Sequence, residues 1–430
     1  MSTSVSIVTL GCKTNQFESA AMAEQLQQAG YQQVAFDAGA DLVIVNTCTV
    51  TAATDSQSRK LIRRAIRLNS EARIVVTGCY AQIDPHSLNQ LPGVSLVIGN
   101  NEKGQLLDYL LENTEPGQVQ VSDIRDSRVI EPLSLTSFEQ RSRAFVQIQN
   151  GCNSFCSYCI IPYARGRSRS VPVADVISQV ESLSANGYPE IVLTGIHIGN
   201  YGQDFELQTN LLTLLQKIEQ SNFSGRLRLG SIEPTELSEE LSTYMNYSDW
   251  ICPHFHIPLQ AGDDEILRRM NRHYSTAFFA NLLDRLHQMN PNAAIGLDVI
   301  TGFPGETDVQ FQITCELLRQ LPLSHLHVFP FSKRAGTPAA DMPEQVSVEV
   351  VKERAAQLRQ IGEEKNRSFA QKFIGSELEI VIEGGGADGL RKGLSRNYLP
   401  VWVPANTAEP GELLQVKITG EYKDGLIGGI

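Results

Sequence analysis

Hydrophobic and polar positions alternate in blocks over the first hundred residues. Short, continuous apolar runs are separated by segments whose apolar residues recur every three or four positions. Apolar runs of this length predict buried strands, and the longer period predicts helices. The predicted strands are residues 5–10, 42–45, 74–76 and 96–98, and the predicted helices between them are residues 16–29 and 52–68. This βαβα order predicts an open parallel sheet with helices on both faces.

A second alternating block begins near residue 144. Its predicted strands are residues 144–149, 191–193, 226–229, 254–257, 295–300 and 325–329, with helices at 173–186, 211–221, 263–270, 278–289 and 309–320. Strands and helices in this alternation form βα units, and six of them are too few to close an eight-stranded barrel. We therefore expect a partial (βα)6 barrel whose active face lies at the carboxyl ends of the strands.

The last part of the chain has a different pattern. Residues 347–373 read as one long, charge-rich helix with Ser347 as its N-cap. Short strands follow at residues 378–382, 398–403, 414–418 and 420–426, separated by Gly and Pro. They predict a small antiparallel β-barrel of the OB-like kind that often binds oligonucleotides. The expected domains are residues 1–114, a polar linker at 115–140, residues 141–373 and residues 374–430.

Composition narrows the class of protein. The chain of 430 residues is 42% hydrophobic, as in an ordinary globular protein. We see no secretory signal and no apolar run of membrane-spanning length, so we expect a cytoplasmic protein that engages no membrane. Thiols stay reduced in that compartment, which makes the eight cysteines candidates for metal ligands or core residues rather than for disulfides.

The charge pattern bears on nucleic-acid binding. A net charge of −12 argues against binding driven by overall charge, but local basic patches remain. These patches are Arg59, Lys60, Arg63, Arg64 and Arg67; Arg165, Arg167 and Arg169; and Arg391, Lys392 and Arg396. A solvated basic face and a phosphate-contacting surface are both open for each patch.

Three cysteines stand close together at Cys152, Cys156 and Cys159, in a C-x3-C-x2-C spacing with no fourth cysteine nearby. A closed structural metal site needs four ligands, so three thiolates leave one metal position open. If they hold a 4Fe–4S cluster, the uncovered iron can bind another ligand. A zinc knuckle or three buried thiols are the alternatives at this point.

A second set, Cys12, Cys48 and Cys79, is spread along the N-terminal region. Each follows a predicted strand. Because the carboxyl ends of parallel strands meet at one edge of a sheet, these thiols can converge into a second three-ligand site. Separate burial of the three cysteines is the alternative. Cys252 and Cys315 have no partner at ligand spacing, so we expect them in the core.

With both triplets in view, the chain resembles the methylthiotransferase family of radical S-adenosylmethionine enzymes over essentially its whole length. The resemblance implies a central radical barrel and a C-terminal RNA-binding TRAM barrel. It implies two 4Fe–4S clusters, an auxiliary one on Cys12, Cys48 and Cys79 and a radical one on Cys152, Cys156 and Cys159. It also implies that S-adenosylmethionine binds the open iron of the radical cluster. No catalytic residue beyond the cluster ligands is assigned.

Further blocks resemble the family's cofactor contacts. Tyr158 matches the position beside the adenine, Thr194-Gly195 lie near the methionine amino group, and Ser231 and Glu233 match ribose contacts. The remaining matches are His256 and Gln260 in the His-x-Pro-x-Gln block, Gly302 and Glu306 in Gly-Phe-Pro-Gly-Glu, and residues 331–337. Ala261 stands where many relatives have serine, so a hydroxyl contact is absent there.

The blocks at residues 11–19 and 46–51, with Lys13-Thr14 and Thr49-Val50-Thr51, resemble the branch that acts on N6-threonylcarbamoyladenosine in tRNA. The predicted function is therefore conversion of that nucleoside, at tRNA position 37, to its 2-methylthio derivative. Isopentenyladenosine in tRNA and a ribosomal-protein aspartate remain alternative substrates. An iron–sulfur electron-transfer protein and a pure RNA-binding protein are the non-enzymatic alternatives.

The chemistry explains why such a cofactor is needed. The adenine C2 position has no leaving group and no acidic proton, so a radical must open its C–H bond. The resemblance implies that one S-adenosylmethionine methylates sulfur held at the auxiliary cluster and another yields the radical. The implied partners are a tRNA anticodon stem-loop, an electron donor such as flavodoxin or ferredoxin, and a sulfur donor. Arg391, Lys392, Arg396 and Tyr398 are the candidate RNA contacts.

Overall fold

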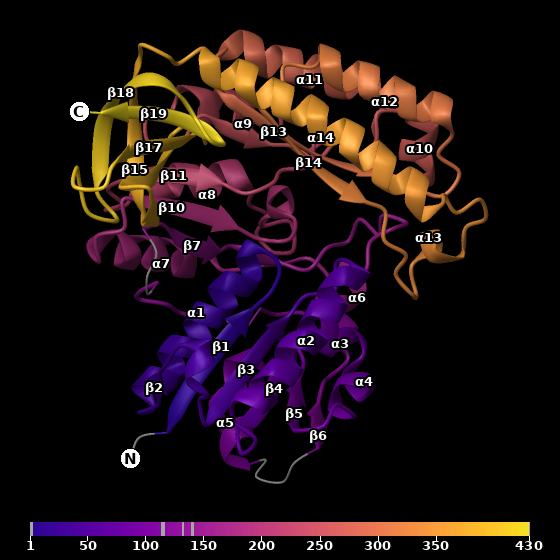
Figure 1. Cartoon of the computed structure of the whole chain (residues 1–430), viewed down its shortest axis with the longest axis vertical. Coiled ribbons are helices and arrows are strands. Elements are labelled where there is room, and N and C mark those ends of the chain that lie inside the picture. The colour runs from indigo at the N-terminus through magenta and orange to yellow at the C-terminus, as the bar shows by residue number, and fades with distance from the viewer. Residues whose placement is uncertain (1–2, 113–116, 131–132, 139–141, 430) are drawn as a thin grey trace.

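The first domain is a six-stranded sheet, lowest in Figure 1. The computed structural model describes residues 3–112, 117–130, 133–138 and 142–429. The strand order is β2-β1-β3-β4-β5-β6, and every neighbouring pair is parallel. The strands are β1 (Ser4–Thr9), β2 (Gln32–Gln33), β3 (Leu42–Thr47), β4 (Arg73–Gly78), β5 (Val94–Ile98) and β6 (Gln118–Gln120). The predicted open parallel sheet is confirmed.

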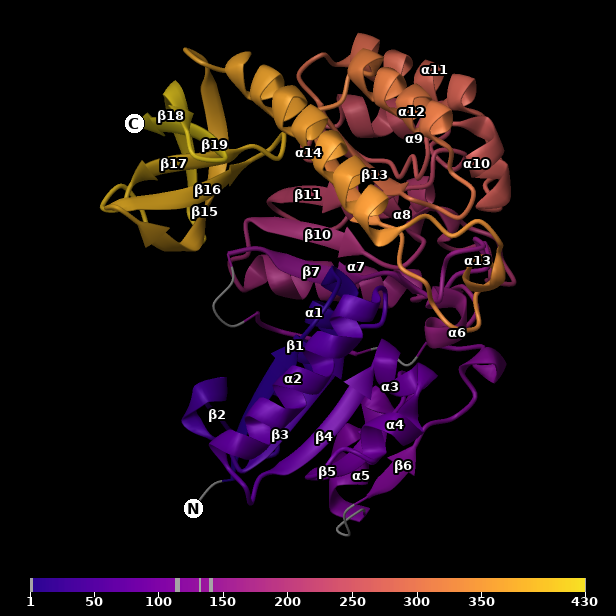
Figure 2. The same cartoon turned by 45° about the vertical axis from the view of Figure 1, so that its right-hand side comes forward.

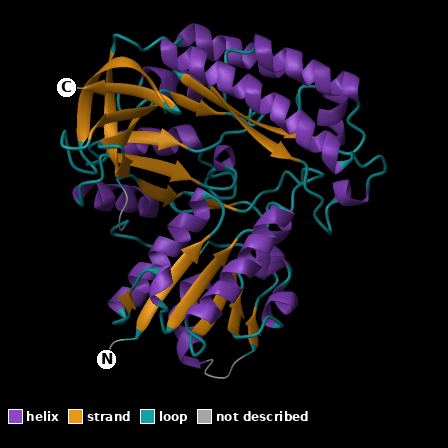
Figure 3. Ribbon diagram, viewed as in Figure 1, coloured by secondary structure: helices purple, strands orange, loops and turns teal. Residues whose placement is uncertain are grey.

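Helices cover both faces of this sheet (Figures 1 and 3). They are α1 (Lys13–Gln28), α2 (Ala52–Leu68), α3 (Cys79–Ile83), α4 (Pro85–Asn89) and α5 (Leu106–Glu112). Helix α2 has the predicted bounds because Thr51 and Thr54 form a capping box at its start. Helix α1 begins three residues earlier than predicted, since the polar run after Cys12 carries no apolar period. Strand β6 lies in the predicted linker and extends the sheet. The predicted boundaries at 114–115 and 140–141 fall outside the described residues.

The central domain is a parallel half-barrel. Its strands are β7 (Ala144–Gln147), β10 (Glu190–Thr194), β11 (Arg226–Leu229), β12 (His254–His256), β13 (Ala294–Thr301) and β14 (His325–Pro330), in that spatial order. Two parallel bridges, Leu227 with Ile251 and Ser231 with His256, join the two halves of the sheet. The predicted partial barrel is thereby confirmed.

The outer face of the half-barrel holds the largest core. Its helices are α7 (Val173–Ala185), α8 (Leu211–Glu219), α9 (Glu239–Tyr247), α10 (Asp264–Arg269), α11 (Thr276–Met289) and α12 (Asp308–Gln320). Leu227, Leu229 and Ile295 belong to this core, and on β11 the leucines alternate with Arg226 and Arg228. Helix α6 (Ile161–Arg165), helix α9 and the short hairpin of β8 (Gln149–Asn150) with β9 (Arg169–Ser170) were not predicted, because none carries a clear apolar period.

The C-terminal domain is a closed five-stranded barrel, yellow in Figure 1. Its strands are β15 (Glu377–Ala387), β16 (Leu390–Ser395), β17 (Pro400–Pro404), β18 (Leu413–Tyr422) and β19 (Gly425–Gly429). Four of its pairs are antiparallel, but β17 and β19 run parallel, with Val401 opposite Leu426. The expectation of a wholly antiparallel barrel is wrong at this closing pair. The predicted strand at 420–426 is divided by the turn between β18 and β19.

One long helix links the last two domains. Helix α14 (Val348–Gln371) runs across the half-barrel and ends beside the C-terminal barrel (Figures 1 and 2). Ser347 caps it as predicted, because its side chain accepts the Val350 N–H. The remaining short helices are α13 (Pro338–Asp341) and the 3-10 turns η1 (Phe36–Ala38), η2 (Glu102–Gln105), η3 (Ile124–Asp126) and η4 (Ile198–Asn200). Among the described residues, we find no helix with the length and apolarity to cross a bilayer.

Candidate active site

The clustered cysteines occupy one tight loop between β8 and α6. The Cys159 N–H donates to the Cys156 carbonyl at 2.9 Å, and the Ser157 N–H donates to the Met270 carbonyl at 3.0 Å, which fixes the loop to the end of α10. Gly151 has a φ of +75°, and a Cβ there would lie 1.9 Å from the Arg167 carbonyl oxygen. Only glycine fits this turn, so the backbone itself holds the three thiols together.

Cationic groups face two of these thiols. His197 Nδ1 lies 3.4 Å from Cys152 Sγ, and its influence lowers the pKa of Cys152 despite burial. Arg272 Nη1 donates to Cys156 Sγ at 3.3 Å. Burial, followed by the charge of Cys156, raises the pKa of Cys159 to about 12. A bound cation that shares the three sulfurs is needed to stabilise all of them as thiolates, and metal binding does this.

The other three cysteines converge as predicted. β1, β3 and β4 are neighbours in the sheet, and Cys12, Cys48 and Cys79 follow their carboxyl ends. Burial raises the pKa of Cys48 to about 11, and the charges of Cys79 and Cys12 add to the rise, so the three thiols are electrostatic neighbours. Cys48 and Cys79 are buried, whereas Cys12 is exposed.

Two glycines make this convergence possible. A Cβ on Gly11 would lie 2.8 Å from Cys48 Sγ, and one on Gly78 would lie 2.3 Å from the Thr47 carbonyl oxygen. Both residues have positive φ values, +94° and +98°. Side chains at these positions would push the strand-end loops apart.

The spread of the sulfur atoms bears on which metal group fits. Among the described residues, the groups whose three ligand atoms all lie within 4.8 Å of one another are His254, His256 and His325, and His256, Asp298 and His327. Neither cysteine triplet is one of them. One zinc ion binds thiolates at about 2.3 Å, so two of its sulfur ligands lie at most about 4.6 Å apart. Neither triplet is thus closed around a single zinc ion, and three thiolates in each set fit a 4Fe–4S cluster with one ligand position open.

A cavity of about 230 Å³ lies between the N-terminal domain and the half-barrel, and Cys159 is the one cysteine among the described residues that line it. Thr51, three residues after Cys48, lines it from the N-terminal domain. Tyr158 and Cys159 line it from the loop between β8 and α6 that carries the clustered cysteines, which we call the radical loop. Gln260 and Asp298 line it from the half-barrel. The structure thus brings two predicted cofactor contacts, Tyr158 and Gln260, into one cavity. His256 lies beside it, with Nε2 2.9 Å from Asp298 Oδ1.

The remaining predicted cofactor contacts divide into two groups. Glu233 forms an ion pair with Arg272, which links it to Cys156. Ser231 pairs with His256 across the sheet, and Thr194 and Gly195 end β10.

Gly302 and Glu306 instead lie against α14. The Glu306 carboxylate accepts the Gly302 N–H at 2.7 Å and pairs with Arg354 at 2.7 Å. The structure therefore places Glu306 in a contact that fixes the long helix, away from the cavity lining.

The candidate RNA contacts lie in two different places on the C-terminal barrel. Tyr398 stacks on His254 with ring centroids 4.3 Å apart, and Arg396 donates to the Ile251 carbonyl at 3.0 Å, so both join the C-terminal barrel to the half-barrel. Arg391 pairs with Glu409 at 3.1 Å and Lys392 with Asp424 at 2.8 Å on the outer side. Lys392 also lies over the Trp402 ring, a residue that sequence reasoning missed.

The buried charge at Arg165 was also missed. Arg165 is 0% exposed, although its sequence context suggested a basic surface. Its Nε donates to Cys79 Sγ at 3.2 Å, and its guanidinium pairs with Glu18, which also pairs with Lys103. Burial opposes its charge, but Cys79 and Glu18 hold the pKa of Arg165 well above its usual value. The sequence carries no signal for this contact, because Glu18 lies 147 positions away.

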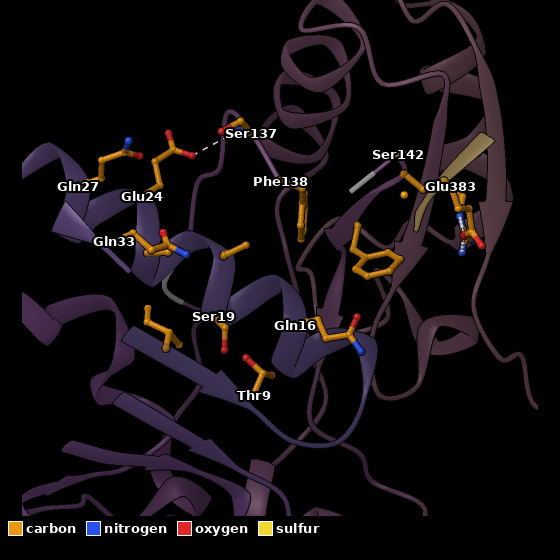
Figure 4. A pocket seen from close by; sticks show the side chains of 16 residues that line it. Thr9, Gln16, Ser19, Glu24, Gln27, Gln33, Ser137, Phe138, Ser142 and Glu383 are labelled. Atoms are coloured by element: carbon orange, nitrogen blue, oxygen red, sulfur yellow. Dashed lines mark hydrogen bonds and ion pairs between the residues drawn. The ribbon is translucent and has the colours of Figure 1, made fainter. Parts of the chain in front are cut away.

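A separate cavity of about 530 Å³ lies between α1 and the start of the half-barrel (Figure 4). Its lining is mainly polar and includes Gln16, Ser19 and Glu383. Among the described residues that line it there is no cysteine, so this cavity is distinct from the one that Cys159 lines.

Known proteins resemble the chain in both cysteine domains. Residues 4–99 match the family model described as Uncharacterized protein family UPF0004, and residues 146–318 match the Radical SAM superfamily. A threonylcarbamoyladenosine tRNA methylthiotransferase MtaB from Bacillus subtilis is 40% identical over 422 residues, covering 96% of this chain and 93% of the relative. The chain belongs to the radical S-adenosylmethionine methylthiotransferase family. Membership implies a 4Fe–4S cluster and S-adenosylmethionine as cofactors.

A second relative and a more distant solved structure also resemble the chain. The MtaB of Rickettsia prowazekii is 37% identical over 415 residues, covering 96% of this chain and 94% of that one. Among solved structures, the radical S-adenosylmethionine methyltransferase TsrM from Kitasatospora setae has a TM-score of 0.59 at 16% identity, covering 91% of this chain and 81% of that one. At that identity the likeness supports the fold alone.

Proposed function

We propose that this chain converts N6-threonylcarbamoyladenosine at position 37 of tRNA to its 2-methylthio derivative. The observation that carries the proposal is a pair of three-cysteine sites, each one thiol short of full ligation, whose two domains line one cavity through Cys159 and through Thr51, three residues after Cys48. An electron-transfer protein would use fully ligated clusters, and a pure RNA-binding protein would need neither site. The names of the relatives supply the substrate.

In this proposal, Cys152, Cys156 and Cys159 hold the first cluster and leave one iron for S-adenosylmethionine. The bound cofactors supply the radical that a C2–H bond requires. Arg272 and His197 stabilise negative charge on the thiolates, and Glu233 holds Arg272 in place. Tyr158 forms part of the cavity wall as a half-buried ring.

Cys12, Cys48 and Cys79 hold a second 4Fe–4S cluster in the same proposal, and its open iron carries the sulfur to be transferred. The glycine turns at Gly11 and Gly78 hold these thiols together at the carboxyl edge of the sheet. An electron donor such as flavodoxin or ferredoxin and a sulfur donor complete the reaction. We place the reaction in the cytoplasm, where thiols stay reduced.

The domain boundaries in the proposal follow the predicted ones, with one change. Residues 1–114 and strand β6 form the auxiliary-cluster domain, residues 141–373 the radical barrel with α14, and residues 374–430 the TRAM domain. The target nucleotide must leave the anticodon-loop stack to reach the cavity.

On the TRAM domain, Arg391 and Lys392 remain candidates for phosphate contacts. Lys392 and Lys423 both lie over the Trp402 ring, at 5.8 and 5.0 Å from its centroid. An aromatic ring beside two ammonium groups suits a stacked base and its phosphate. Arg396 and Tyr398 are not part of this surface in the proposal, because they join the TRAM domain to the radical barrel.

Nucleoside mass spectrometry of tRNA from cells with and without the gene tests the proposal. We expect the 2-methylthio form of threonylcarbamoyladenosine to disappear without the gene and to return with the intact chain. Cys48→Ala should fail to restore it, while purified Cys48→Ala protein still cleaves S-adenosylmethionine. A loss of methylthiolated isopentenyladenosine instead, or a mass change in a ribosomal protein, would contradict the substrate.

A further inference from the structure

The radical loop supplies a buried cation to the other cysteine site. Arg165 ends α6, six positions after Cys159 (165 − 159). Its side chain is fully buried and reaches the N-terminal domain, where Nε lies 3.2 Å from Cys79 Sγ. The arginine next along the same basic run, Arg167, is exposed.

Every nitrogen of this guanidinium has a partner. Nη1 donates to Glu18 and, at 3.3 Å, to the Asn150 side chain, while Nη2 donates to Asn15 and, at 3.1 Å, to Glu18. Lys103 forms a second ion pair with Glu18, so one carboxylate serves two buried cations and leaves a net positive charge beside the Cys79 sulfur. A fork held at every donor has one orientation, and that orientation directs Nε at the sulfur.

Stability alone does not explain this arrangement. Burying charged groups costs a large desolvation free energy, and apolar side chains of similar volume often stabilise a core equally well. An N–H directed at a thiolate ligand has a different effect. It withdraws electron density from the sulfur and favours the more negative, reduced form of an attached cluster, which raises the reduction potential. Low dielectric strengthens the influence of the fixed positive charge.

We infer that Arg165 is a positioning residue that raises the reduction potential of the auxiliary cluster through Cys79, and that it couples this cluster to the radical loop. The inference rests on the proposed second cluster. It adds a residue outside both cysteine triplets whose role is electrostatic. Arg272 stands in the same relation to Cys156 in the radical site, again held by one glutamate.

The test isolates the auxiliary cluster in the full-length chain. Cys152, Cys156 and Cys159 are changed to Ala, the protein is reconstituted anaerobically with iron and sulfide, and its midpoint potential is measured by EPR-monitored redox titration. In this background, Arg165→Gln should shift the midpoint to a more negative value. Arg165→Lys should give a smaller shift in the same direction, because an ammonium keeps the charge but lacks the fixed fork. Arg167→Gln, the exposed control, should leave the midpoint unchanged.

These variants separate tuning from folding. The conservative variant Arg165→Lys keeps the charge, and Arg165→Gln leaves Glu18 paired with Lys103, so neither variant leaves a buried carboxylate without a cation. Four irons per chain and an unchanged circular dichroism spectrum establish that each variant is loaded and folded. Loaded variants with the parental midpoint would overturn the inference alone. A parent that binds no iron would overturn the second cluster of the proposed function, and the inference with it.

Discussion

At the scale of single residues, buried charge is concentrated where the domains meet. Glu190 on β10 is fully buried and pairs with Arg226 at 2.7 Å and Arg228 at 2.8 Å. Arg228 also donates to the Ser395 and Arg396 carbonyls of the C-terminal barrel. One carboxylate therefore holds two arginines that together bind a neighbouring domain.

Removing that carboxylate should be costly. Burial opposes the charge of Glu190, but Arg228, Arg226 and Arg143 outweigh it and lower its pKa to about 2. Glu190→Gln leaves buried arginines without their anion, so we expect a loss of about 3 kcal/mol in the free energy of unfolding at pH 7. Urea unfolding followed by circular dichroism measures it.

The pH dependence checks the cause. Because the folded pKa of Glu190 lies below the ordinary value of 4.5, its stabilisation is complete above about pH 4.5 and is lost as the pH falls towards 2. The difference between the native protein and Glu190→Gln should shrink over that interval. A difference that is the same at pH 7 and pH 3 would show that the ion pairs are not its source.

At the scale of elements, the strand ends of the N-terminal sheet decide whether the second site forms. Parallel strands bring their carboxyl ends to one edge, and the turns after β1 and β4 contain glycines in the left-handed region. The turn after β4 is tighter than the turn after β1, because a Cβ added to Gly78 would overlap the backbone of β3.

Gly78→Ala should therefore abolish the auxiliary site. A Cβ 2.3 Å from the Thr47 carbonyl oxygen must displace Cys79, so we expect iron content to fall by about half while S-adenosylmethionine cleavage persists. Gly30→Ala is the matched control, because Gly30 has a φ of +89° but no atom within 4 Å of its added Cβ. Full iron content in Gly78→Ala, or equal losses in both variants, would count against this explanation.

At the scale of the whole molecule, the half-barrel contacts the N-terminal and the C-terminal domain in different places. Arg334, after β14, pairs with Asp55 of α2 at 2.7 Å, and Arg165 pairs with Glu18 of α1. On the other side, Tyr398 stacks on His254. The N-terminal and C-terminal domains thus dock on the half-barrel through separate contacts, so each can be weakened without the other.

Tyr398→Ala should loosen the C-terminal barrel alone. Loss of the stack and of the Arg228 guanidinium contact, 5.1 Å from the ring centroid, should increase proteolytic cleavage near residue 374. Cleavage of S-adenosylmethionine should remain, because the cavity lies at the other interface. Limited proteolysis alongside an assay of cofactor cleavage measures this, and a variant that no longer cleaves the cofactor would contradict the separation.

Substitutions on the outer face of the C-terminal barrel should weaken RNA binding without loosening the barrel. Lys392→Ala and Lys423→Ala remove the ammonium groups beside Trp402, so we expect weaker binding of an anticodon stem-loop. The salt slope should fall by about 1 for each lysine that binds a phosphate. Proteolysis should not change. Binding measured by fluorescence anisotropy across a salt series checks it, and unchanged affinity would move the RNA surface elsewhere.

The predictable features of the site share one property. Cys152, Cys156 and Cys159 are neighbours in the chain, and Cys12, Cys48 and Cys79 follow apolar runs whose strand character is local. Neither inference needs distant contacts. Arg165 could not be identified in the same way, because a buried and an exposed arginine can have the same local sequence. Trp402 could not be identified either, because its position beside Lys392 and Lys423 depends on the register of β16 against β17 and on the β18–β19 turn.

The amino-acid sequence by itself determined the alternation of strands and helices, the half-barrel and both three-cysteine sets, since these depend on periodicity and on short spacings. Only the tertiary structure decided that Thr51 and Cys159 line one cavity, that Arg165 contacts Cys79, and that Glu306 and Tyr398 serve packing between elements. The physical reason is burial. Whether a polar side chain meets water, a ligand or another domain depends on residues more than a hundred positions away, as with Arg165 and Glu18.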